Sequence, residues 1–165
     1  MDRHALWRSE SIRGNKTVRL AIRFLEHDMT QRVREPLANL MFVQEPASHE
    51  DLQQLAGRLG CAVPDDYVEF LRLSNGAEGF VGRDEYIALY SIEDIIKANV
   101  EEEFWREYVP GLLLFCSNGG GTAYAFDSRT PGMPVVDTPF IGGGLDYLTP
   151  QGNTLSEFIE SLDDA

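Results

Sequence analysis

The segment 117–127, which reads SNGGGTAYAFD, constrains the fold of this chain more than any other part. It follows an apolar run, Leu112 to Phe115, and places three glycines between two β-patterned segments. Because glycine adopts positive φ angles at little steric cost, this arrangement predicts a tight β-hairpin. Side chains alternate between the faces of a strand, so Tyr124 and Phe126 are expected on one face of a half-buried strand. The residues expected on its other face are Ala123, Ala125 and Asp127.

Amphipathic helices are predicted before and after this hairpin, because apolar residues recur every three or four positions. Residues 17–34 follow that pattern and carry arginines on the opposite face. Further helices are expected at 48–59, 64–73 and 91–109, and a last one begins after the N-cap residue Thr154. Short strands are predicted at 79–81, 86–90, 135–136 and 145–148.

This order of elements predicts an α+β fold with a single, mostly antiparallel (mixed) sheet flanked by helices. Glu45-Pro46-Ala47 interrupts the pattern and marks a linker. We therefore divide the chain into a polar tail with an amphipathic helical extension, residues 1–47, and a folded domain, residues 48–165. The chain, 165 residues long, is large enough for one domain with a sizeable core.

Charge is distributed unevenly along the chain. Residues 1–60 hold nine basic and eight acidic residues, whereas residues 61–165 hold five basic and nineteen acidic residues, a formal net charge of −14. Such a surface repels nucleic acid and anionic membranes and attracts basic partners. Two interpretations follow: the acidity serves solubility alone, or it forms a face that meets a cationic protein.

Neither a membrane span nor a signal peptide is predicted from the apolar runs. We therefore expect a cytoplasmic protein. The two cysteines, Cys61 and Cys116, each have apolar neighbours and are expected to be small buried side chains rather than a disulfide or zinc ligands.

Catalytic chemistry is poorly supported by the residue pattern. The three histidines, His4, His27 and His49, all precede residue 50, which argues against a Ser-His or Cys-His pair in the domain. The glycine runs lack the spacing of a phosphate-binding loop. Asp127, Asp137 and Asp146 lie near predicted strand ends and are candidates for a cation site, but solvated turn residues are the default interpretation. We expect no catalytic residue, no metal and no cofactor.

The candidate binding site is the acidic side of the helix predicted at 91–109. Its aromatic centre is Trp105, which is either an exposed hot spot for a basic partner or part of the core. The turn before residue 86 is expected to lie nearby. The acidic residues of this candidate site are Glu101, Glu102, Glu103, Glu107, Asp84 and Glu85.

Four phrases in one order carry a family resemblance. They are LGCAVPDDYVEFL followed by SNG at 59–76, PGL at 110–112, GGGTAYAFD at 119–127, and TLSEFI at 154–159. Together they span about residues 48–162, and this region resembles the SUKH superfamily, which includes the fungal Smi/Knr-type cell-wall regulators and many bacterial immunity proteins. The first forty-odd residues match nothing in that pattern.

The resemblance implies an α+β domain in which Asp127 stabilises a turn through backbone hydrogen bonds. It also implies a non-catalytic interaction domain. In bacteria this is an immunity protein that binds and neutralises a secreted or contact-delivered toxin, often a nuclease. A regulatory or scaffold module without a toxin partner is the alternative, and a carboxylate-dependent hydrolase is a third.

Overall fold

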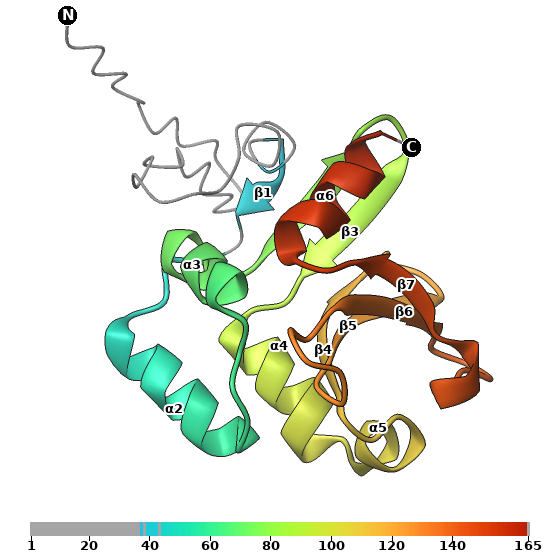
Figure 1. Cartoon of the computed structure of the whole chain (residues 1–165). Helices are drawn as coiled ribbons and strands as arrows, with labels where there is room; N and C mark the ends of the chain where they lie inside the picture. Colours follow the sequence, from blue (N-terminus) through green and yellow to red (C-terminus); the bar gives the residue numbers. More distant parts are fainter. Residues whose placement is uncertain (1–36, 38, 43, 165) are drawn as a thin grey trace, which may run out of the picture.

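The strands form one antiparallel meander. The computed structural model describes residues 37, 39–42 and 44–164, so the helix predicted at 17–34 lies outside the described part. Within that part, seven strands pair in the order in which they follow in sequence, and every pairing is antiparallel (Figure 1). They are β1 Met41–Phe42, β2 Ala77–Val81, β3 Glu85–Leu89, β4 Leu112–Ser117, β5 Thr122–Asp127, β6 Val135–Pro139 and β7 Thr149–Gly152.

Helices lie on both sides of this sheet, which confirms the α+β prediction. Ser48 and Ser91 form capping boxes with Asp51 and Asp94, and Thr154 caps the last helix through its side chain. The helices are α2 His49–Leu59, α3 Asp65–Leu73, α4 Ile92–Ile96, the π-helix η1 Lys97–Glu101, α5 Glu103–Tyr108, the 3-10 helix η2 Leu145–Tyr147 and α6 Leu155–Asp163. None of the helices in the described ranges is long and apolar enough to span a membrane.

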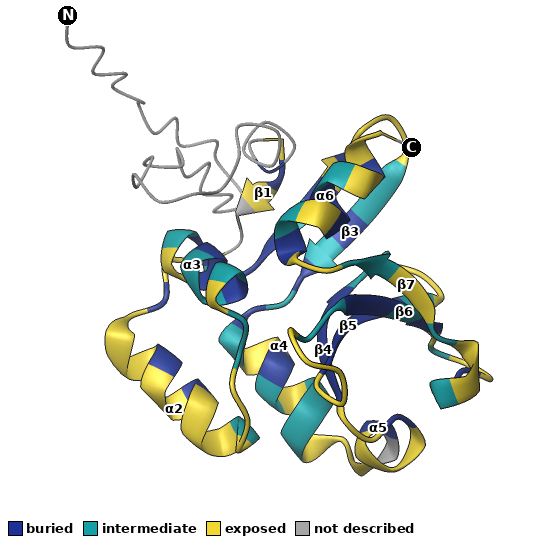
Figure 2. Ribbon diagram, in the orientation of Figure 1, coloured by how far each residue is buried: buried dark blue, intermediate teal, exposed yellow. Residues whose placement is uncertain are grey.

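The glycine-rich hairpin is confirmed as the β4–β5 turn. The Asn118 carboxamide oxygen accepts hydrogen bonds from the backbone N–H groups of Gly120 and Thr122, both at 3.0 Å. Positive φ is needed at Gly119, where a Cβ would also collide with the ring of Tyr86. The prediction of a half-buried strand is wrong, because β5 is buried on both faces from Ala123 onward (Figure 2).

One face of the sheet, which we call the first face, shares its core with α2, α3, α4 and α6, and α2 lies against α4 (Figure 1). At its centre Phe115 and Phe126 stack at 4.0 Å, and Tyr67 of α3 and Phe158 of α6 meet Phe115 edge-on. The Tyr67 hydroxyl donates to the carbonyls of Tyr90, at 2.7 Å, and Phe115, at 3.1 Å. The aromatic residue of the DDYVEFL phrase therefore ties α3 to the middle of the sheet.

The opposite face, the second face, has a smaller core. Ala123 and Ala125 of β5 contribute to it, as predicted, and Leu112 and Leu114 of β4 lie beside them. Trp105 and Val109 of α5 cover these strands, together with Phe140, Leu145 and Leu148 from the loop before β7. The side chains of β5 on the second face are therefore buried under α5 and the segment before β7, which explains why β5 is buried on both faces.

Three predicted features differ from the structure. The helix expected at 91–109 is divided by η1, where the Asn99 side chain bonds to both backbone groups of Leu114 in β4. The segment 145–148, expected to be a strand, contains the 3-10 helix η2, and its Leu145 and the following Leu148 pack against the second core. Cys61 is exposed in the loop after the αL cap Gly60, whereas Cys116 is buried as expected.

Candidate interaction groove

A groove opens on the second face of the sheet between β2–β3 and α5. We define the groove by the residues that line it, which enclose a cavity of about 380 Å³. Its floor comes from β2, β3 and Leu114, and one wall comes from η1 and the start of α5. Tyr90, Trp105 and Phe140 supply aromatic surface, and the charged lining residues are Glu78, Asp94, Lys97 and Glu102.

The groove depends on side chains that pin the 91–105 segment to the sheet. The Asn75 carboxamide oxygen accepts from the N–H of Ile92 at 2.8 Å, which fixes the start of α4 beside the Ser74-Asn75-Gly76 turn. Farther on, Asn99 donates to the carbonyl of Leu114 and accepts from its N–H, both at 2.8 Å. These bonds satisfy backbone groups of β4 and hold η1 against the sheet. Trp105 is thereby placed against Phe140, with ring centroids 5.3 Å apart.

The charge of the groove is negative. Three carboxylates and one ammonium group line it, and Asp94 is held in its capping box with Ser91. Among the ion pairs of the described residues, none involves Glu78, Lys97 or Glu102. Burial raises the pKa of Tyr90 to about 12, and the nearby Asp94 and Glu102 add to the effect of burial. The wall of the groove therefore places a half-buried phenol beside acidic groups.

Two aromatic residues, the exposed Phe80 and the half-buried Tyr86, continue the groove along the β2–β3 hairpin. Glu78 lies at the groove and accepts a hydrogen bond from the Tyr86 hydroxyl at 3.0 Å. Tyr86 in turn meets Phe80 edge-on at 5.4 Å. Phe80 and Tyr86 are register partners, as are Glu78 and Ala88, so all four lie on one face of the hairpin. Phe80 is 59% exposed and lies beside the groove residue Glu78 on this face.

Two of the predicted site residues line the groove, namely Glu102 and Trp105. Trp105 is 8% exposed and belongs to the second core, so its interpretation as an exposed hot spot is wrong and the core alternative holds. The reason is the break at η1, which turns α5 so that this ring packs under the 140–148 loop. Its contribution to the groove is one edge of the aromatic wall.

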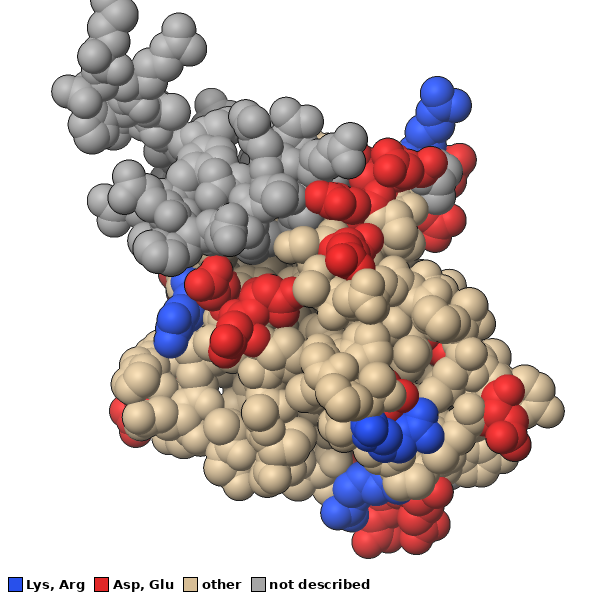
Figure 3. All heavy atoms as spheres, in the orientation of Figure 1, with Lys and Arg blue, Asp and Glu red and all other residues tan. Residues whose placement is uncertain are grey.

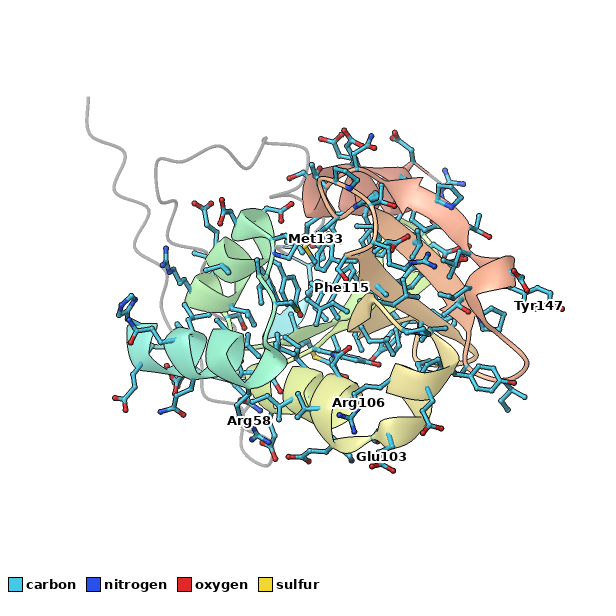
Figure 4. All side chains as sticks on the ribbon, turned by 60° about the horizontal axis from the view of Figure 1, so that its bottom comes forward. Arg58, Glu103, Arg106, Phe115, Met133 and Tyr147 are labelled. Atoms are coloured by element: carbon cyan, nitrogen blue, oxygen red, sulfur yellow. The ribbon has the colours of Figure 1, made fainter. Side chains whose placement is uncertain are left out.

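The other predicted acidic residues are dispersed. Glu101 pairs with Arg58 of α2 at 3.3 Å, and Glu103 lies 3.9 Å from Arg106 on α5 (Figure 4). Glu107 is exposed on α5. Basic and acidic side chains accordingly lie side by side at α5 in Figure 3, and this helix is less negative than its sequence indicates.

Asp84 and Glu85 lie at the other end of β3, away from α5 (Figure 1). A Cβ at the adjacent Gly82 would lie 3.0 Å from the carbonyl of Leu162, which places this turn beside the end of α6. The expectation that the turn accompanies the acidic helix is wrong. It joins instead a second acidic region over α6, visible in Figure 3.

The predicted turn role of Asp127 is confirmed. Its carboxylate accepts from the backbone N–H of Arg129 at 3.0 Å and pairs with the Arg129 guanidinium at 2.8 Å. This guanidinium and the local hydrogen bonds lower the pKa of Asp127. Asp137 accepts from Gln151 instead, and no group of three potential metal ligands occurs among the residues that the structure describes.

The sequence analysis did not identify most of the groove residues. One pattern could have pointed to Glu78 and Phe80: in β2 they alternate with small or buried residues, which places both side chains on the same, less buried face of the strand. Tyr86 lies in the strand predicted at 86–90, but the sequence pattern does not indicate a part in binding. Phe140 and Tyr90 gave no signal, since their side chains reach the groove only after the loop and the sheet are assembled.

The chain is similar to known proteins over most of this domain. The sequence model of the SMI1/KNR4 family (SUKH-1) matches residues 46–161. A relative in Bacillus subtilis (strain 168), the uncharacterized protein YnaB, is 32% identical over 121 residues. This match covers 73% of the present chain and 65% of the relative, so the chain spans less than two thirds of that protein.

Proposed function

Because the chain belongs to the SMI1/KNR4 (SUKH-1) family, we propose that it is a non-catalytic interaction domain that acts as an immunity protein in the cytoplasm. Its partner is a basic protein, a secreted or contact-delivered toxin, and neutralisation occurs by stoichiometric occlusion of a basic toxin surface. The observation that carries the proposal is the groove, in which Glu78 and Glu102 stand beside aromatic surface.

Three properties of the groove support a protein partner. It is concave, it combines aromatic and carboxylate groups, and it continues into the exposed Phe80 and its ring neighbour Tyr86. Aromatic side chains are enriched among the residues that contribute most to protein interfaces. Carboxylates that face a cationic partner accelerate association and favour the correct partner. Glu103 and Glu107 are exposed on α5 near the groove residue Glu102, with Arg106 between them, and we call these two glutamates the acidic rim.

Co-expression tests the proposed function directly. We expect the full chain to restore growth to cells that produce the toxic domain encoded beside its gene, and to co-purify with that domain. A regulatory or scaffold module predicts neither rescue nor a complex with that toxin. Failure of rescue with a toxin that is demonstrably active would therefore overturn the immunity proposal.

Charge reversal locates the interface. The triple variant E102K/E103K/E107K is expected to weaken toxin binding and rescue without unfolding the domain, because all three residues are exposed. The matched control E157K/E160K/D163K places the same charge change on α6. Equal binding by the wild type and the first variant would refute this acidic rim as the interface.

A further inference from the structure

The geometry points to an arginine-binding site: we propose that the groove receives an arginine side chain of the partner, between the carboxylates of Glu78 and Glu102 and the aromatic wall. This inference rests on the proposed function for the identity of the partner, but the site itself is testable without that partner. It makes the groove, rather than the outer side of α5, the specificity-determining part of the interface.

The charges on the groove define the sign of the ligand. Glu78 comes from β2, Asp94 from α4, and Glu102 from the junction of η1 and α5, whereas Lys97 is the single cation among the described residues that line the groove. Asp94 accepts two bonds from Ser91, both at Oδ2, which hold its carboxylate at the start of α4. Glu78 accepts one bond, from Tyr86, and keeps further acceptor positions, because an ionised carboxylate has about four. A cationic group entering the groove therefore meets Glu78 and Glu102, beside the capping carboxylate of Asp94.

The aromatic wall distinguishes arginine from lysine. Trp105 and Phe140 lie edge to face at 5.3 Å, and Tyr90 lines the same cavity. A guanidinium is planar and weakly hydrated, so it stacks on aromatic rings while its N–H groups donate to carboxylates. An ammonium group is more strongly hydrated and lacks the planar fork that bonds two acceptors together. The combination of lining groups therefore favours arginine.

The surroundings of the groove favour an arginine carried by a polypeptide. The cavity of about 380 Å³ accommodates one long side chain, and its lining residue Glu78 lies two positions from the exposed Phe80 on the same face of β2. Residues that flank the arginine in a partner would lie across the Phe80–Tyr86 pair. Lys97 opposes the cation from the η1 side, so it reduces affinity for arginine and raises the requirement for both glutamates.

Trp105 provides a direct reporter of this site. The chain has two tryptophans, Trp7 and Trp105, so the full-length W7F variant leaves one indole, in the groove wall. We expect titration with Nα-acetyl-arginine amide to change its fluorescence and to saturate in the millimolar range, because so small a ligand binds weakly. The neutral isostere Nα-acetyl-citrulline amide should leave the spectrum unchanged. Equal responses to both compounds, or no response to arginine, would overturn the proposal.

Variants in the W7F background separate the groove from the acidic rim. E78Q/E102Q removes both groove charges with little change of shape and should raise the dissociation constant at least about tenfold. E103Q/E107Q removes the same charge from the outer side of α5 and should change it less than about twofold. K97Q should tighten binding. Near-ultraviolet circular dichroism confirms that each variant retains the packing of its tryptophan.

The same variants distinguish failure of this inference from failure of the proposed function. Arginine binding without rescue from a toxin supports the groove and overturns the immunity proposal. Rescue that survives in E78Q/E102Q, together with unchanged arginine titrations, supports immunity and overturns the groove as its arginine site.

Discussion

The first face of the sheet is covered by the core that it shares with α2, α3, α4 and α6, whereas the second face is covered over β4–β6 and forms a groove beside β2–β3. On the first face, Phe115, Phe126 and Phe158 are fully buried and in ring contact. On the second face, Phe80 is exposed in a strand that also contributes Val81 to the first core. One β-hairpin thus contributes to the core through one side and leaves an exposed aromatic side chain and a groove on the other.

The largest effect on stability is expected from the first face. Phe115→Ala removes the ring at the centre of its aromatic cluster and should lower the free energy of unfolding by about 3–5 kcal/mol, because the surrounding α3, β5 and α6 cannot close the cavity. Urea denaturation followed by far-ultraviolet circular dichroism measures this. A loss below about 1 kcal/mol would show that this face is not the tightly packed one.

A smaller effect is expected at the junction that shapes the second face. Asn99→Ala leaves the N–H and carbonyl of Leu114 without their side-chain partner and should cost about 1–3 kcal/mol in unfolding free energy. Because η1 then detaches from β4, arginine binding in the groove should also weaken. Gln53→Ala, on the exposed side of α2, is the control for an exposed side chain. If the variant is less stable but binds arginine with unchanged affinity, the packing of η1 against β4 does not determine the shape of the groove.

A pH-dependent effect is expected from Asp127, whose side chain projects from β5 toward the second face. Its pKa is lower in the folded state than its ordinary value of 3.8, so the stabilisation is fully present at neutral pH. It declines as the pH falls below that ordinary value and is lost through the folded-state pKa.

Asp127→Asn should therefore cost about 1–2 kcal/mol at pH 7, and the difference from the wild type should narrow at pH 3. Urea denaturation at the two pH values measures both differences. A difference that grows toward acid would contradict the assigned direction of the shift.

The smallest effect on stability is expected on the open face. Phe80→Ala should change the free energy of unfolding by less than about 0.5 kcal/mol, because the ring is exposed and its neighbour Tyr86 remains bonded to Glu78. The same variant should lower toxin affinity at least about fivefold if this face is the interface. Isothermal titration calorimetry with the purified toxin domain makes the comparison. Marked destabilisation would assign Phe80 to the fold instead.

Much of the fold was accessible from sequence because its signals are local. Capping residues at Ser48, Ser91 and Thr154 and the glycines at 119–121 were each recognised from neighbours within a few positions. The family resemblance over 48–162 agrees with the match at 46–161. The break at η1 was missed because it depends on a bond between Asn99 and Leu114, which are fifteen positions apart.

The candidate site was harder to predict, because its charges belong to segments that meet only in three dimensions. Glu101 and Glu103 read as one acidic face with Glu102, yet arginines from α2 and α5 lie against two of the three. The sequence does not single out Glu78, because its hydrogen bond to Tyr86, which connects the groove to the Phe80–Tyr86 pair, forms only in the folded hairpin. A run of like charges specifies composition, but not the counter-charges that folding brings to it.

The sequence by itself determined the hairpin, most helix starts, the family and the acidic balance, because periodicity, caps and glycine conformations act over a few residues. Only the tertiary structure decided which side of β2–β3 carries the groove and that Glu78 and Glu102 line one cavity. It also decided that Trp105 is a buried side chain at the edge of that cavity and not an exposed contact residue. Those outcomes depend on how the segment from α4 to α5 packs across the sheet. Packing is set by the simultaneous fit of distant segments, which no local pattern contains.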